Sequence, residues 1–207
     1  MDTELIFQLA VLIMSVVIHE VSHGYAALAL GDQTAKYEGR LTLNPLRHLD
    51  PMGSFFVPLV SYMLGGFIIG WAKPVPYNPH NLRPGRWSEA VVAGAGPASN
   101  LVVAVIFGLL LRAGMSGGLG VVNTGFISIV TIIVFINIVL ALFNLMPVPP
   151  LDGSKLLFAL FSENFIEIRH FFERHSLVLL LFFIFFLWQF IFPVSTLIFS
   201  LITGISL

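Results

Sequence analysis

The chain has 207 residues, of which 57% are hydrophobic and 10% are charged, and it contains no cysteine. Soluble domains average about 45–50% apolar and about 25% charged residues, so this composition, with a mean hydropathy of +0.94, indicates a membrane protein. The formal net charge of −1 excludes a basic surface for nucleic acid. The lack of cysteine excludes disulfides, thiol chemistry and cysteine-ligated metals.

Five apolar stretches predict where the chain meets the membrane. A spanning helix needs about 20 apolar residues, and four stretches reach that length: 5–31, 90–113, 120–147 and 176–201. The fifth, 54–72, is shorter and is interrupted by Pro58 and three glycines, so we expect it to be re-entrant. The sequence therefore predicts one all-α polytopic membrane domain over 1–207, with four transmembrane helices and one re-entrant segment.

Lysine and arginine residues gather in two connecting segments, 32–88 and 152–175. Cytoplasmic loops carry an excess of basic residues, which places both segments in the cytoplasm and both chain ends outside. Both can be cytoplasmic only if 54–72 enters and leaves the membrane on the same side. Alternating β-formers at 40–43 also predict a short membrane-associated β element.

The first apolar stretch contains an HExxH pattern, His19-Glu20-Val21-Ser22-His23. Residues one helical turn apart share a helix face, so both imidazoles can bind one metal ion. Glu20 lies beside them, where it can take a proton from a metal-bound water. Ionisable residues inside a membrane span are costly and usually functional. This favours a metal site over two histidines bonded to neighbouring carbonyls.

A catalytic zinc ion usually has three protein ligands and one open position. Without cysteine, the third ligand must be His, Asp or Glu, and Asp152, Asp50, His48 and Glu38 are the candidates. Asp152 is favoured over Asp50 and His48 because it follows prolines that end the apolar stretch 120–147. Unwound backbone at membrane depth lies within protein or lines a watery cavity. The predicted topology places both histidines and Asp152 in the cytoplasmic half of the membrane.

Five motifs occur in order along the chain: HEVSHG at 19–24, GRLTLNP at 39–45, GWAKPVP at 70–76, GPASN at 96–100 and NLMPVPPLDG at 144–153. With these motifs the chain resembles the site-2 protease family of intramembrane zinc metalloproteases, in its short form without extra domains. The resemblance implies hydrolysis of peptide bonds within or near the bilayer. One Zn²⁺ ion would be held by His19, His23 and Asp152, with Glu20 as the general base.

The resemblance also implies roles for residues outside HExxH. Asn144 would steady the scissile carbonyl or its oxyanion. Substrate-binding residues would be Gly96 and Asn100 near the substrate groove, with Leu41, Leu43 and Asn44 on a strand that pairs with the substrate. Alternatives stay open, because Gly96 could serve only close helix packing and Asn144 could be a hydrogen-bonding residue between helices.

The expected partners are a single-span membrane protein or membrane-embedded peptide as substrate, and membrane lipid. We expect a multi-pass protein whose active site lies toward the cytoplasmic side of the cell membrane. The main alternative is a membrane metal transporter or metal-binding protein without protease activity. A silent binder of membrane segments and a lipid or prenyl-ester hydrolase also stay open. Glu20 favours the protease, because the HExxH glutamate supplies a base rather than a ligand.

Overall fold

The computed structural model describes residues 3–57, 59–60, 63, 72–117, 123–161, 166–186 and 188–206. Its longer helices are α1 (Thr3–Ala29), α4 (Ser88–Met115), α5 (Thr124–Asn144) and α9 (Trp188–Thr203). Its shorter helices are α2 (Thr34–Tyr37), α6 (Asp152–Leu160), α7 (Ile166–Arg174) and α8 (Ser176–Phe186). Single turns η1 (Pro45–His48), η2 (Met52–Phe56) and η3 (Pro79–Asn81) lie in the connecting segments.

Among the described residues, three helices are long and apolar enough to cross a membrane: α1, α4 and α5. A fourth span is present if α8 and α9, which are bent by 63° relative to each other, are counted as one. The expectation of an all-helical membrane protein is confirmed. The apolar stretch 176–201, expected to form one transmembrane helix, consists of this bent pair.

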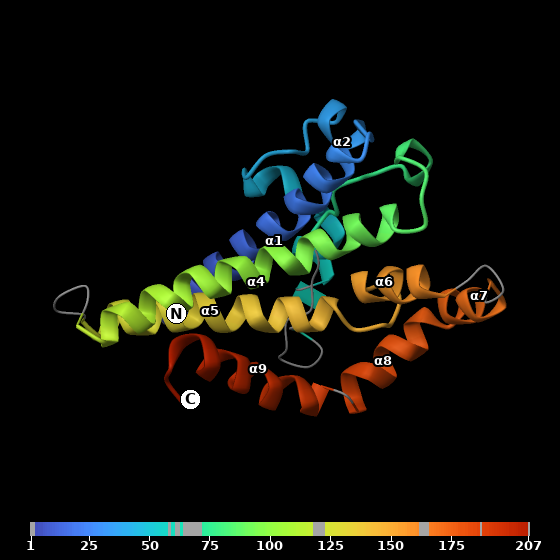
Figure 1. The fold of residues 1–207 in the computed structure, drawn as a ribbon. Coiled ribbons are helices and arrows are strands. Elements are labelled where there is room, and N and C mark those ends of the chain that lie inside the picture. Colours follow the sequence, from blue (N-terminus) through green and yellow to red (C-terminus); the bar gives the residue numbers. More distant parts are fainter. Residues whose placement is uncertain are drawn as a thin grey trace.

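Helix α4 lies at the centre of the bundle, in contact with α1, α5, α6 and α9 (Figure 1). The helices α1 and α5 both run toward the end of the bundle where α6 lies, and α4 runs in the opposite direction (Figure 1). The C-terminal halves of α1 and α5 are therefore neighbours of the start of α4. This arrangement brings residues from three distant parts of the chain to one end of the bundle.

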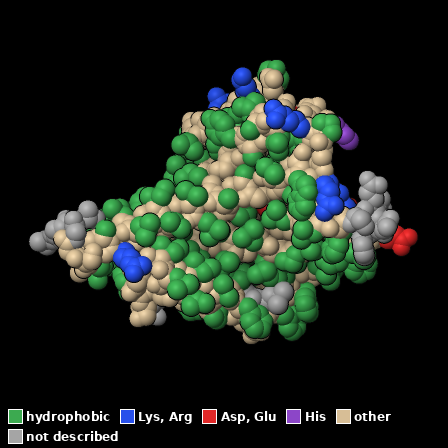
Figure 2. Space-filling view, viewed as in Figure 1, with side chains coloured by type: hydrophobic (Ala, Val, Ile, Leu, Met, Phe, Trp, Pro, Cys, Tyr) green, Lys and Arg blue, Asp and Glu red, His purple; other side chains and the backbone are tan. Residues whose placement is uncertain are grey.

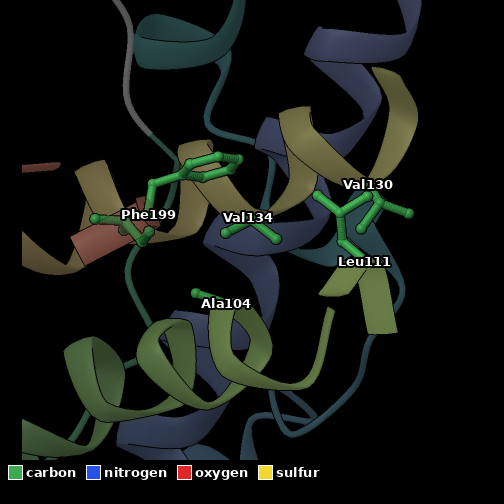
Figure 3. Packing of buried hydrophobic residues seen from close by; sticks show 6 residues of the cluster. Ala104, Leu111, Val130, Val134 and Phe199 are labelled. Atoms are coloured by element: carbon green, nitrogen blue, oxygen red, sulfur yellow. The ribbon is translucent and has the colours of Figure 1, made fainter. Parts of the chain in front are cut away.

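The main apolar core lies between α4, α5 and α9. It consists of six buried residues, five of which are labelled in Figure 3: Ala104, Leu111, Val130, Val134, Ile138 and Phe199. Lipid tails are as apolar as these side chains, so helices in a membrane associate through close van der Waals packing. Gly108 permits that approach, because a Cβ at this position would collide with the Ile202 side chain on α9.

Large hydrophobic side chains also cover the outside of the bundle (Figure 2). Exposed examples on α4, α8 and α9 are Val102, Ile106, Phe185 and Leu201. Lysine and arginine side chains lie mainly at the end that contains α2 and α6 (Figure 2). An apolar belt of this extent is typical of a surface that faces lipid, so the chain is an integral membrane protein.

The predicted β element at 40–43 is wrong, because no strand is present in the described residues. Arg40 is buried, and its guanidinium donates to the backbone carbonyls of Arg47, Lys73 and Pro74. A strand needs a paired neighbour for its backbone groups. Here the segment is held by side chains that bond to backbone, a pattern that alternation of residue types does not reveal.

The predicted re-entrant segment, 54–72, falls largely on residues 58, 61–62 and 64–71, which lie outside the described residues. Its flanks are informative, because the Lys73 N–H donates to the His48 carbonyl over 2.8 Å. Residues 48 and 73 therefore lie together, on the same side of the bundle. The re-entrant path of 54–72 itself stays a prediction.

Candidate metal centre

Helix α1 carries His19 and His23 on the face that packs against α4. Their side chains are 7% and 10% exposed, so both imidazoles are shielded from solvent and lipid. The two rings meet edge to face, with their centroids 4.6 Å apart. The one-turn spacing of HExxH thus places two nitrogen donors together, as the sequence predicts.

Asp152 completes the cluster from the first residue of α6. Its Oδ2 lies 3.1 Å from Nε2 of His19 and 3.1 Å from Nε2 of His23. The ligand atoms of these three residues all lie within 4.8 Å of one another. Among the described residues, His19, His23 and Asp152 are thus placed so that they could bind one metal ion. The expected convergence of the early histidines and the late aspartate is present.

The outer nitrogen of each imidazole bonds to an oxygen. His23 Nδ1 lies 2.7 Å from the backbone carbonyl of Val92, and His19 Nδ1 lies 2.6 Å from Oδ1 of Asn100. A carbonyl oxygen only accepts, so Nδ1 is the protonated nitrogen in both rings. In the neutral form of each imidazole, Nε2 therefore directs its lone pair toward the carboxylate of Asp152.

This donor set fits a zinc ion. Two imidazole lone pairs and a carboxylate that converge on one point repel each other unless a cation lies among them. Zinc bonds of about 2.0–2.2 Å in a tetrahedron separate neighbouring ligand atoms by roughly 3.3–3.5 Å. The observed 3.1 Å separations are close to that spacing. Two His and one carboxylate are a ligand set of catalytic zinc.

Gly96 on α4 leaves the space in which the imidazoles lie. A Cβ at this position would be 2.5 Å from Nε2 of His19 and 2.5 Å from Nε2 of His23. Such an approach is far inside van der Waals contact, so a side chain here would displace both rings. The structure places Gly96 against the histidines rather than in a purely structural helix contact.

Glu20 lies next to the cluster and accepts a hydrogen bond from segment 73–75. The Val75 backbone N–H donates to Glu20 Oε2 over 2.9 Å. This bond leaves Oε1 available to another partner. Segment 73–75 is itself tied to Arg40, whose guanidinium donates to two carbonyls of this segment. Glu20 is therefore fixed beside the histidines by a backbone group.

A cavity of about 210 Å³ opens in front of these groups. It is lined by thirteen residues: His19, Glu20, His23, Pro74, Val75, Tyr77, Val92, Ala93, Asn144, Pro150, Leu151, Asp152 and Lys155. Asn144 is the last residue of α5, and its Nδ2 donates to the Leu140 carbonyl over 2.9 Å. The cavity thus presents a possible base, the metal ligands and a polar amide to one small volume.

The other residues singled out from the sequence lie elsewhere. Leu41 is half-buried, Leu43 and Asn44 are exposed, and none of the three lines this cavity in the described residues. Asn100 is fully buried behind His19. The substrate contacts predicted for these residues stay predictions.

Two of the alternative third ligands, His48 and Asp50, are not part of the cluster in the described residues. His48 is buried, with Nε2 2.9 Å from the Thr42 carbonyl. Asp50 accepts backbone N–H groups of Met52 and Gly53 at the start of η2. Within the described residues, neither joins the His19–His23 cluster.

Sequence reasoning missed the polar groups behind the histidines. Ser15 and Asn137 are buried and connected to Asn100. Asn137 stands in the apolar run 120–147. A polar residue in such a run is expensive and usually has a role, and this was the available signal.

Three comparisons with known proteins add to this geometry. The family model described as Peptidase family M50 matches residues 114–188, a range that contains Asn144 and Asp152. A candidate zinc metalloprotease of Bacillus subtilis, YwhC, is 42% identical over 149 residues, which cover 70% of this chain and 65% of that protein. The candidate zinc metalloprotease Rip2 of Mycolicibacterium smegmatis is 35% identical over 141 residues, 68% of this chain and 52% of that protein.

Rip2 of Mycobacterium tuberculosis is similar over the same extent, with 30% identity over 145 residues, 70% of this chain and 53% of that protein. The matched part of the chain thus spans between half and two thirds of the length of these relatives. No solved structure matches the chain.

Proposed function

This chain belongs to peptidase family M50, and from that premise we propose that it is a zinc-dependent protease that cleaves membrane-embedded protein segments. The observation that carries the proposal is the meeting of His19, His23 and Asp152 beside Glu20 in one cavity. The HExxH motif lies inside a helix long enough to cross the membrane. Its substrates would therefore be single-span proteins or peptides that reach the same depth.

In this proposal His19, His23 and Asp152 hold one zinc ion. When bound, zinc lowers the pKa of a coordinated water toward about 7 and polarises a carbonyl. Glu20 takes the proton of the attacking water and passes it to the leaving amine. The Val75 N–H bond orients Glu20 for both transfers by fixing Oε2.

Asn144 would donate a hydrogen bond to the scissile carbonyl oxygen as negative charge develops on it. Its side chain lines the cavity, and one hydrogen of Nδ2 remains after the bond to Leu140. A single donor of this kind contributes about 3–4 kcal/mol in related acyl-transfer chemistry. Leu43 and Asn44, which are exposed, would contact substrate only outside the described cavity.

Three variants of the purified, reconstituted chain test the mechanism. Glu20→Gln should keep zinc and lose about 100- to 10,000-fold in the rate of cleavage of a single-span substrate, because the base is gone. Asp152→Ala should lose both zinc and cleavage, because a ligand is gone. Asp50→Ala, a carboxylate outside the cluster, should keep both. Cleavage rate and bound zinc per protein are the two measurements.

The same variants separate the protease from a metal transporter. A transporter would move zinc into vesicles equally well with Glu20→Gln, because that residue is not a ligand. Undiminished cleavage by Glu20→Gln would contradict the proposed mechanism. If Asp152→Ala retained zinc and Asp50→Ala lost it, the third zinc ligand would be Asp50 instead of Asp152.

A further inference from the structure

A chain of buried side-chain amides runs from the metal cluster into the centre of the bundle. It joins Asn100 on α4 to Asn137 on α5 and reaches Ser15 on α1, one helical turn before His19. Asn100 and Asn137 are 0% exposed. Neither lines the cavity, so neither can contact substrate there.

Two backbone carbonyls determine which group donates and which accepts in each hydrogen bond between these side chains. Asn137 Nδ2 lies 2.8 Å from the Ile133 carbonyl, which can only accept, so Nδ2 must face it. Asn137 Oδ1 then faces Asn100 and accepts from Asn100 Nδ2 over 2.8 Å. The Ser15 carbonyl, 3.3 Å from Asn100 Nδ2, requires the same orientation of Asn100.

The orientation of Asn100 determines which nitrogen of His19 carries the proton. With Nδ2 directed at Asn137, Asn100 Oδ1 faces His19 Nδ1 over 2.6 Å, and this oxygen only accepts. Nδ1 must therefore donate, and Nε2 presents its lone pair to the cluster. A flipped Asn100 would offer an N–H to Nδ1 and place the proton on Nε2, where it blocks metal binding.

We propose that Asn100 and Asn137 are positioning residues that hold His19 as the Nδ1–H tautomer and so keep Nε2 available to a metal ion. Asn137 acts at a distance, by fixing the amide of Asn100. The inference rests on the zinc site of the proposed function, and it gives Asn100 a role other than the substrate contact expected from the sequence.

A purely structural role is the competing explanation, because asparagines hydrogen-bond between membrane helices and add stability. The two explanations differ in what they change. Structural amides alter the unfolding temperature and leave the intrinsic zinc affinity of the folded chain unchanged. Positioning amides alter zinc affinity even though Asn137 touches neither the metal cluster nor the cavity.

The experiment measures the zinc dissociation constant of the full chain in detergent, by competition with a chelator of known affinity. Asn100→Leu and Asn137→Leu, which keep the branched shape of the asparagine side chain and remove its polar groups, should weaken zinc binding by about 10- to 100-fold, the usual effect of losing the partner of a metal-binding histidine. Ser195→Ala is the control. Its buried hydroxyl donates to the Ile191 carbonyl within α9 and it does not line the cavity, so it should leave zinc affinity unchanged.

Two further measurements keep the proposal testable if a leucine variant does not fold. Asn100→Asp keeps an acceptor for His19 Nδ1 and loses the donors to Asn137, so it should bind zinc close to wild type at a reduced unfolding temperature. Nitrogen-15 spectra of the histidine side chains should show His19 protonated at Nδ1 in wild type. In Asn137→Ser, which fits the same space, the signal should shift toward a tautomer mixture.

Zinc affinities of Asn100→Leu and Asn137→Leu equal to wild type would overturn the proposal, as would an equal loss in Ser195→Ala. A His19 protonated at Nε2 in wild type would also overturn it. A wild-type chain that binds zinc and cleaves no membrane substrate would remove the protease function and leave this inference standing.

Discussion

Gly96 shows how much the metal cluster depends on one missing side chain. The glycine sits in α4, where alanine favours the helix by about 1 kcal/mol, yet a Cβ would lie 2.5 Å from both Nε2 atoms. The motif GPASN marks this position in the sequence without revealing its neighbours. Only the packing of α1 on α4 shows that the small residue faces the histidines.

We predict that Gly96→Ala keeps a folded, helical chain and loses zinc, because both rings must rotate away from the added methyl group. Gly94→Ala is a matched control on the same helix, since its Cβ would meet Leu156 at an ordinary 3.6 Å. Bound zinc per protein, measured beside the unfolding temperature, separates the two. Full zinc content in Gly96→Ala would mean that the rings lie elsewhere.

At the scale of elements, Asp32 ties the end of α1 to the segment before α4. Its side chain is 1% exposed and accepts from the Thr34 hydroxyl and N–H, from the Asn78 N–H and from Asn81 Nδ2. Burial acts against the charged form, but these hydrogen bonds outweigh it and hold the pKa of Asp32 below the usual value for an aspartate. The charged form is therefore favoured by folding.

The pKa shift predicts a pH-dependent stability. A carboxyl whose pKa is lower in the folded chain stabilises it fully above the unfolded pKa of about 3.9, and the benefit disappears as pH falls through the lower folded pKa. Asp32→Asn should lower the free energy of unfolding by about 1–3 kcal/mol at pH 7. The difference from wild type should shrink below about pH 4. Thermal unfolding across pH measures this, and a constant difference would contradict it.

Some helices could be predicted from the sequence, whereas the strand expected at 40–43 is absent from the described residues. The helices α1, α4 and α5 follow from long apolar runs, and α5 ends before the prolines at 147 and 149–150, as proline chemistry requires. The strand at 40–43 could not be judged from alternation alone, because a strand exists only with a partner. Arg40 instead points inward to backbone carbonyls, a tertiary contact.

For the whole molecule, the meeting of His19 and His23 with Asp152 could be predicted because it follows from topology. Helices α1 and α5 run in the same direction, so the later part of α1 and the end of α5 share one end of the bundle (Figure 1). The buried amides could not be predicted in the same way. Asn137 is visible in the sequence as a polar residue in an apolar run, but its partner on α4 depends on how the helices rotate.

The last prediction concerns which end of the bundle faces the cytoplasm. The Arg83 N–H donates to the Leu30 carbonyl over 2.8 Å, so the end of α1 and the approach to α4 lie on one side. Lysine and arginine residues are frequent both in the segment that follows α1 and in the segment that precedes α4. Cytoplasmic loops of membrane proteins are enriched in these residues. The metal site should therefore open toward the cytoplasm, which lies at the opposite end of α4 from Ser116.

Because the chain has no cysteine, a single introduced cysteine reports this orientation directly. Lys36→Cys and His80→Cys, at exposed positions near the metal-site end, should react with a membrane-impermeant maleimide only after the cells are opened. Ser116→Cys, exposed just after α4, should react in intact cells. The reverse labelling pattern would show that the metal site opens to the outside of the cell. Substrate segments and water would then approach it from that face of the membrane.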